Sequence, residues 1–182
     1  VDAGKVTAEE LSMWFMAMRF LFTSQEVAQA EALLMEVTNN KPSIPELRLM
    51  SKTWLATGKS GHSRAQELAR LAVEACPPQD TNLMVDVLRE QADVFLVSGE
   101  FAQGAEVYKK ILAIKPDFVS VLNNLSYMMA ENMGQALEAI EYSERAVKLA
   151  PRDYSILDTA GWVYFRAGNL DKAEQYLRDS LA

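Results

Sequence analysis

Four prolines divide this chain at nearly regular intervals, each after an apolar stretch rich in alanine. They are Pro42, Pro77, Pro116 and Pro151, separated by 35, 39 and 35 residues. Proline lacks an amide donor and disfavours helix in the residue before it, so it ends helices. A period in the thirties indicates one supersecondary unit that is copied and stacked, not a globule with a single pocket. Stacked units present an extended surface, so we expect a protein that binds other proteins.

The composition favours a folded, all-α chain. Of its 182 residues, 49% are apolar and 24% charged, which is too apolar for a disordered protein. Glycine and proline are few, while straight-chain residues that lose little rotamer freedom in a helix are plentiful. No apolar run approaches the roughly 18 residues that cross a bilayer, so we expect no direct membrane insertion. The chain begins with Val1 and shows no targeting pattern, and we expect it to be a fragment of a longer protein.

Charge and chemistry exclude several classes of function. A net charge of −7 makes nucleic acid and anionic membranes poor partners. His62 and Cys76, each the single residue of its type, are expected about 20 Å apart at opposite ends of one helix. We interpret His62 as a loop residue and Cys76 as an inert apolar one. The stretch GKSGHS from Gly58 lacks the spacing of a phosphate-binding loop. We therefore expect no enzyme activity, no catalytic residue, no metal site and no cofactor, and the compartment stays open.

Helical hairpins are clearest at the C-terminal end. The spacing i, i+3, i+4, i+7 in the first helix of the last unit is met by Leu157, Ala160, Gly161 and Tyr164. A turn at Gly168 and Asn169 ends this helix, because both residues accept the left-handed conformation. A second helix follows from Leu170, and Glu138, Glu141 and Glu144 of the preceding unit are expected on a solvated face.

Small residues recur where paired helices would cross most closely. In the first helices these are Ser51, Ala92, Ser126 and Gly161, and in the second helices Ala30, Ala65, Gly104, Ala139 and Ala173. A larger side chain there would hold the helices apart and open a void. Larger residues recur nearby and are expected to fill the space between units: Leu21, Trp54, Phe95, Met129 and Tyr164.

This pattern resembles the tetratricopeptide repeat, of a type common in bacterial proteins. The family's small, large and terminal proline positions are matched most closely from about Val85 onward. The resemblance implies a right-handed α-solenoid of about five helix-turn-helix repeats. We expect one solenoid over 1–182, with approximate repeats at 7–42, 44–77, 81–116, 117–151 and 153–182.

Some features depart from the family pattern. About five extra residues between Pro77 and Met84 are expected to lengthen a connection. Ala69 and Ser143 stand where the family prefers a large residue, which leaves open what fills that space. Without a further helix after Ala182, an apolar face is expected at the C-terminal end.

The resemblance also implies a binding groove lined by the first helix of each repeat. Transferred to this sequence, the groove positions are Phe15, Arg19, Phe22, Arg48, Lys52, Asp86, Arg89, Asp93, Asn123, Tyr127, Asp158, Trp162, Phe165 and Arg166. Trp162 is the strongest candidate, because exposed aromatic side chains dominate binding hot spots. Arg48, Lys52 and Arg89 are expected to form a cationic patch with a weak preference for acidic peptides, or else to pair with Asp86 and Asp93.

Two functions remain open. The first is a non-catalytic scaffold that binds a partner peptide or helix in the groove. The alternative is a structural module that self-assembles as a homo-oligomer through its terminal repeat, in an envelope or exopolysaccharide-export assembly.

Overall fold

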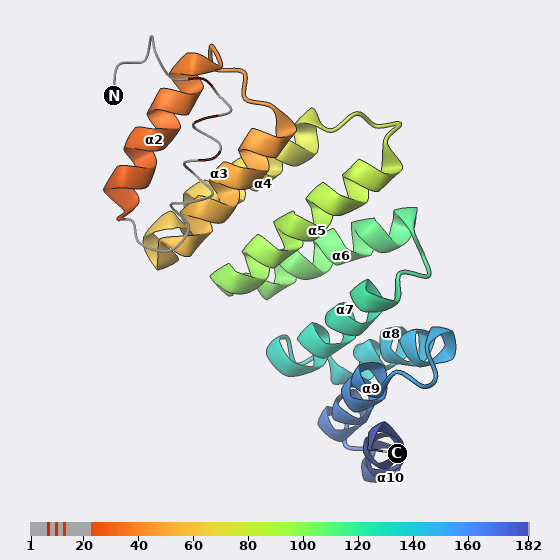
Figure 1. The fold of residues 1–182 in the computed structure, drawn as a ribbon. Coiled ribbons are helices and arrows are strands. Elements are labelled where there is room, and N and C mark those ends of the chain that lie inside the picture. The colour runs from red at the N-terminus through yellow and green to blue at the C-terminus, as the bar shows by residue number, and fades with distance from the viewer. Residues whose placement is uncertain (1–6, 8–9, 11–12, 14–22, 182) are drawn as a thin grey trace. The chain divides into compact units, whose positions relative to one another are not determined.

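The computed structural model describes residues 7, 10, 13 and 23–181, and within these every regular element is helical (Figure 1). The chain divides into two compact units, Val1–Gly99 and Glu100–Ala182, called here the N-terminal and the C-terminal unit. This division falls inside the third predicted repeat. The predicted groove residues Phe15, Arg19 and Phe22, as well as Leu21, lie outside the described residues.

The described helices of the N-terminal unit form hairpins of similar length. They are α2 (Ser24–Val37), α3 (Ile44–Ala56), the short 3-10 helix η2 (Gly58–Gly61), α4 (His62–Ala75) and α5 (Thr81–Ser98). Helix α3 packs against α4, and α4 packs against α5. The core between them holds the fully buried side chains of Val27, Leu34, Met50 and Leu68.

The C-terminal unit repeats this arrangement. Its helices are α6 (Phe101–Ile114), α7 (Val119–Asn132), α8 (Ala136–Leu149), α9 (Tyr154–Arg166) and α10 (Leu170–Ser180). The closest partners are α7 with α8 and α9 with α10, while α9 also packs against α7 and α8. Two consecutive hairpins therefore place their first helices, α7 and α9, side by side (Figure 1).

The small residues lie where the sequence predicts them, and all nine are buried. In α3 the hydroxyl of Ser51 donates a 2.8 Å hydrogen bond to the carbonyl of Ala65 in α4, so these two positions meet directly. In α9 a Cβ on Gly161 would lie 2.7 Å from Cγ of Leu177 and 3.2 Å from the carbonyl of Ala173. Side chains this small are what allows each helix pair to approach closely.

Some of the residues predicted to end helices do so in the structure, and others have a different role. Gly168 has φ +82 as predicted, but Asn169 has φ −92 and instead accepts a 3.2 Å bond from the amide of Lys172, which starts α10. Helix α2 ends before Pro42, because Asn39 and Asn40 adopt the left-handed conformation with φ of 52 and 57. Asparagine can end a helix in this way because it tolerates that conformation better than most residues.

Two segments of the N-terminal unit that the sequence predicts as connections are partly helical. The expected insertion near Pro77 instead lengthens α5, which begins at Thr81 and has 18 residues. Residues 58–61 form η2, and His62 is the first residue of α4, so the prediction of a loop histidine is wrong. The extra residues therefore add helix turns and not irregular chain.

Candidate functional site

The predicted groove residues within the described part of the chain fall on four first helices. They are Arg48 and Lys52 on α3, Asp86, Arg89 and Asp93 on α5, Asn123 and Tyr127 on α7, and Asp158, Trp162, Phe165 and Arg166 on α9. Because side chains four residues apart share one helix face, each helix presents its members as a stripe. The two units contain two separate sets of these stripes.

In the N-terminal unit, Glu90 joins the stripes of α3 and α5. Its carboxylate accepts 2.8 and 2.7 Å hydrogen bonds from Nε and NH2 of Arg48, and a 2.6 Å bond from Nζ of Lys52. Burial raises the pKa of Glu90, but the bonds from Arg48 and Lys52 outweigh it, and the pKa falls below its usual value. Fork-to-fork contact of this kind is the strongest geometry for an arginine-carboxylate pair.

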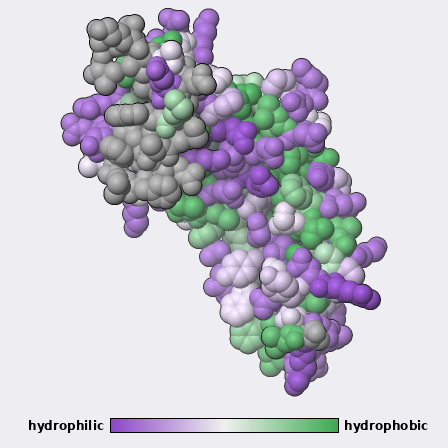
Figure 2. Space-filling view, in the orientation of Figure 1, coloured by the Kyte–Doolittle hydropathy of each residue, from purple (hydrophilic) through white to green (hydrophobic). Residues whose placement is uncertain are grey.

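This pairing neutralises the predicted cationic patch. Arg89 lies 3.7 Å from Asp86, so three cations and three carboxylates share the face of α3 and α5. Figure 2 shows hydrophilic side chains gathered over these helices. Desolvation raises the pKa of Asp93, and the nearby charge of Arg89 offsets it only in part. The pairing predicted with Asp86 and Asp93 therefore exists for Arg89, whereas Arg48 and Lys52 bind Glu90.

In the C-terminal unit, Glu131 joins the stripes of α7 and α9. Its carboxylate accepts a 3.0 Å bond from the indole nitrogen of Trp162 and forms an ion pair with Arg166. The guanidinium of Arg166 also lies over the Trp162 ring, 5.9 Å from its centroid. Trp162 is consequently half-buried and fixed in orientation.

Two aromatic side chains beside this cluster are more accessible than Trp162. Phe165 is 50% exposed, and its ring centroid lies 5.5 Å from that of Trp162. Tyr127, one turn before Glu131 on α7, is 46% exposed. Asp158 is exposed, whereas Asn123 is half-buried with its Oδ1 atom enclosed and without a hydrogen bond. We call Tyr127, Trp162 and Phe165 the aromatic surface of the C-terminal unit.

Sequence reasoning missed the two carboxylates that organise these faces. Glu90 lies four residues after Asp86, and Glu131 lies four residues after Tyr127. Glu90 lies within the span of the predicted α5 stripe and Glu131 one turn beyond the α7 stripe, so helical spacing could have indicated both residues. Which cation each carboxylate binds, however, depends on the neighbouring helix.

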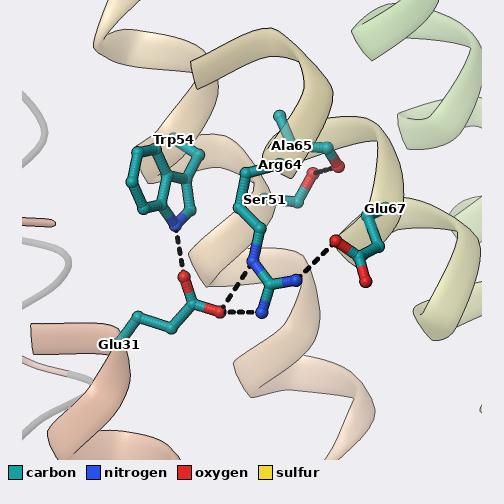
Figure 3. A network of polar contacts seen from close by, with 6 residues as sticks. All are labelled: Glu31, Ser51, Trp54, Arg64, Ala65 and Glu67. Atoms are coloured by element: carbon teal, nitrogen blue, oxygen red, sulfur yellow. Dashed lines mark hydrogen bonds and ion pairs between the residues drawn. The ribbon is translucent and has the colours of Figure 1, made fainter. Parts of the chain in front are cut away.

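A second kind of carboxylate contact joins consecutive hairpins. Glu31 of α2 is buried, and its Oε2 accepts a 2.6 Å hydrogen bond from the indole nitrogen of Trp54 in α3 (Figure 3). Its Oε1 accepts a 2.9 Å bond from Nε of Arg64 in α4, whose other end donates to Glu67. One buried carboxylate thus holds three helices of the N-terminal unit together.

Glu144 has the same role in the C-terminal unit. From α8 it accepts hydrogen bonds from the hydroxyls of Tyr164 in α9, at 2.5 Å, and Tyr176 in α10, at 3.1 Å. Lys172 adds a 3.5 Å ion pair. Burial raises the pKa of Glu144, but these three donors lower it below its usual value. The prediction of a solvated face holds for Glu138 and Glu141, which are exposed, but is wrong for Glu144.

The Tyr176–Glu144 contact predicts a loss of stability in alkali. Burial, followed by the bond to Glu144, raises the pKa of Tyr176 from 10.0 to about 12. Because the folded pKa is the higher one, this stabilisation is complete below pH 10 and is lost as the pH rises towards 12. Tyr176→Phe should therefore cost about 1 kcal/mol at pH 8 and almost nothing near pH 12. Thermal unfolding of both proteins from pH 8 to 12 measures this, and a pH-independent difference in Tm would contradict it.

Among the residues that the structure describes, no group of three or more His, Cys, Asp or Glu side chains could hold a metal ion. Cys76 is buried at the end of α4, and burial raises the pKa of its thiol, which favours the protonated form. Within the same residues, no helix has both the length and the apolar character needed to cross a bilayer.

Helix α10 exposes both charged and apolar side chains at the C-terminal end, where an apolar face is expected. Ala173 is its one buried residue, and its exposed side chains include Asp171, Lys172 and the ion-paired Glu174 and Arg178. Leu181, beyond the helix, is 89% exposed. Leu170, the first residue of α10, is 62% exposed, so apolar and charged side chains alternate at this end.

Paired antiparallel helices with small residues at their crossings, and first helices that share a face, define a helical-repeat protein of the interaction-scaffold class. Residues 119–153 and 154–182 match the family model of the tetratricopeptide repeat. Residues 119–182 thus carry tetratricopeptide repeats, and the resemblance to that family and the all-α fold predicted from the sequence are confirmed.

Comparisons with individual proteins agree. The chain is 36% identical over 106 residues to a TPR repeat-containing protein of Pseudomonas aeruginosa, a match that covers 57% of this chain and 17% of the relative. The chain thus spans only about a sixth of that relative's length.

Solved structures named MamA share the fold. One, titled MamA MSR-1 C2, has a TM-score of 0.67 and 15% identity, covering 95% of this chain and 91% of that one. Another, MamA 41-end from Desulfovibrio magneticus RS-1, has a TM-score of 0.68 and 15% identity, covering 94% of each chain. At this identity the likeness concerns the fold alone.

Proposed function

We propose that this chain is a non-catalytic scaffold that binds a segment of a partner protein across α7 and α9. The observation that carries the proposal is the aromatic surface: Phe165 is half-exposed beside Trp162, whose indole binds Glu131, and Tyr127 is half-exposed on the neighbouring helix α7. Aromatic residues that are already ordered lose little entropy on binding and are frequent in hot spots.

The charges around the aromatic surface support a partner segment that is mainly apolar. Arg166 is paired with Glu131, so its charge is offset before any partner arrives. Asp158 and Arg166 are both exposed on α9, but only Arg166 of these two forms an ion pair with Glu131. A partner with an apolar or aromatic side chain and a nearby cation would therefore bind best, which differs from the acidic preference expected from Arg48 and Lys52.

Phe165→Ser and Tyr127→Ser should each reduce capture of the partner at least tenfold while changing Tm little, because both side chains are half-exposed. The experiment is a pull-down from cells that express the intact protein, with the partner identified by mass spectrometry. Leu149→Ser is the matched control, since Leu149 is 42% exposed on α8 and lies outside the aromatic surface. Equal capture of the same partner by all four baits would refute the proposed surface.

The predicted role of Trp162 can be tested separately. Because its indole binds Glu131, Trp162→Ala should reduce both binding and stability. Trp162→Phe keeps an aromatic ring without the N–H donor, so it should retain more binding than the alanine variant. Self-assembly remains the alternative, and light scattering over a range of concentrations would detect it as growth in mass.

A further inference from the structure

Two open hollows on the surface of the C-terminal unit share Leu137 as a wall. One, of about 530 Å³, is bounded by α8 and the turn from α9 to α10, and its walls include Ile140 and Leu170. The other, of about 420 Å³, lies beside α6 and the turn from α7 to α8, and its walls include Met129 and Tyr142. Each has the volume of an ordinary binding cleft, and Leu137 stands between them.

The packing of the repeats does not account for leucine at positions 137 and 170. Leu137, the second residue of α8, is 72% exposed, and Leu170 begins α10 and is also exposed. These helices pack through the buried residues Ala139 and Ala173, which follow two and three residues later. Exposed apolar side chains that share one hollow and are rimmed by polar residues mark an interaction site.

Carboxylates outnumber cations among the residues that line the hollows. Glu138 and Glu141 line one hollow and Asp171 the other, and all three are exposed. Of the lining residues that the structure describes, Lys109 is the one cation, and it is paired with Glu106 at 2.8 Å. Glu141 meets a cation only at 3.9 Å, and no ion pair holds Glu138 or Asp171 within the described part of the chain. The hollows therefore present apolar walls beneath a negative rim.

This charge decides between the possible occupants. A second copy of the same face would place carboxylates against carboxylates, and nucleic acid or an anionic bilayer would be repelled. A partner segment with leucine-like side chains flanked by lysine or arginine matches both the walls and the rim. In a helix, the Cβ atoms of residues i and i+4 lie about 5–6 Å apart. Two such side chains can enter the two hollows with Leu137 between them, as a knob packs between residues of a facing helix.

We propose that Leu137 and the two hollows form a second docking surface, the Leu137 surface, which binds a basic amphipathic helix of a partner protein. This surface is separate from the aromatic surface, because Tyr127, Trp162 and Phe165 line neither hollow. The C-terminal unit can therefore hold one partner on each surface, which is how a scaffold joins two proteins.

The test uses an alanine-based helical peptide of about 15 residues, with two leucines one helical turn apart and lysines on both sides of them. Fluorescence anisotropy of the labelled peptide, titrated with the complete chain, gives the dissociation constant. We expect about 100 μM, because few side chains are buried. The amide NMR signals of Gly168 and Asn169, which line one hollow, should shift as the peptide binds. Two matched peptides, with glutamate in place of lysine or alanine in place of leucine, should each bind at least about fivefold more weakly.

Variants of the chain place the peptide on the Leu137 surface. Leu137→Ser and Glu138→Lys should each weaken binding at least about fivefold without changing the helical content, because both side chains are exposed. Leu149→Ser is the matched control, since Leu149 is exposed on the same helix but lines neither hollow. Tyr127→Ser should also leave peptide binding unchanged, which separates this surface from the aromatic one.

Four results would overturn the proposal. Equal binding of the glutamate peptide would show that the rim does not select cations, and equal binding by Leu137→Ser would place the peptide elsewhere. A dissociation constant that stays the same from about 0.1 M to about 1 M salt would also contradict it, since screening should weaken binding several-fold. Finally, growth in mass with concentration that Leu137→Ser abolishes would show that the hollows hold a second copy of this chain.

Discussion

Replacing Glu31 by alanine is expected to destabilise the N-terminal unit more than any substitution on the surface. The change removes the acceptor of the Trp54 indole and the main partner of Arg64, which lie on two different helices. Breaking a buried pair by deleting one member typically costs 3–5 kcal/mol, and Arg64 is a third exposed, so we expect about 3 kcal/mol. In a unit of this size that corresponds to a fall in Tm of roughly 12 °C or more.

Thermal unfolding followed by circular dichroism measures this change. Glu67→Ala is the matched control, because it removes the other, exposed carboxylate that binds the same arginine. Exposed pairs contribute less than about 1 kcal/mol. The loss of stability in Glu31→Gln should lie between those of Glu31→Ala and Glu67→Ala, since the amide oxygen still accepts one hydrogen bond but carries no charge. Similar losses in Glu31→Ala and Glu67→Ala would show that the buried contact does not join the helices.

Gly61→Ala is the second substitution with a large expected effect. Gly61 is buried at the end of η2 with φ −96, a conformation open to any residue. A methyl group there would overlap the carbonyl oxygen of Trp54 and the hydroxyl of Thr57, and would lie 2.9 Å from the carbonyl carbon of Trp54. Because the obstacle is mainly helix backbone, a rotamer change cannot relieve it. We expect a cost of about 3–5 kcal/mol.

Gly58→Ala tests the same short helix by a different mechanism. Gly58 has φ +78, and a Cβ there would meet nothing within 4 Å. Its cost is therefore the left-handed strain alone, about 1 kcal/mol. In urea unfolding, the free energy of unfolding of Gly61→Ala should be well below that of Gly58→Ala. The reverse order would mean that the turn rearranges to admit the methyl group at position 61.

The helices and their closest crossings could be predicted from the sequence because both depend on nearby residues. Small side chains such as Ser51 and Gly161 occupy recurring places, and the periodicity of each helix fixes which face they share. The end of α2 was misplaced because Asn39 and Asn40 act before the proline that marks the period. In that case a local turn signal took precedence over the repeat.

The carboxylates could not be assigned from the sequence, since glutamate on a helix is usually solvated. Glu31, Glu90 and Glu144 hold helices together only because donors on other helices face them, 20 to 42 residues away in the chain. For the same reason the cationic patch was predicted with free charges at Arg48 and Lys52. The sequence therefore predicted which positions share the candidate surface. Only the structure showed which of their charges are paired.

The carboxylates of Glu31 and Glu144 also limit how freely the hairpins could be exchanged. Arg64 and Lys172 occupy equivalent places at the start of their helices, and each binds a carboxylate on the second helix of the preceding hairpin. Relative to the small residues Ala30 and Ala139 of those helices, Glu31 lies one residue later and Glu144 five residues later. If the hairpins were joined in another order, the carboxylate facing each cation would lie about one helical turn away from the position that the ion pair requires. Each hairpin is therefore matched to its own neighbour through the position of this ion pair, which favours the existing order of the repeats.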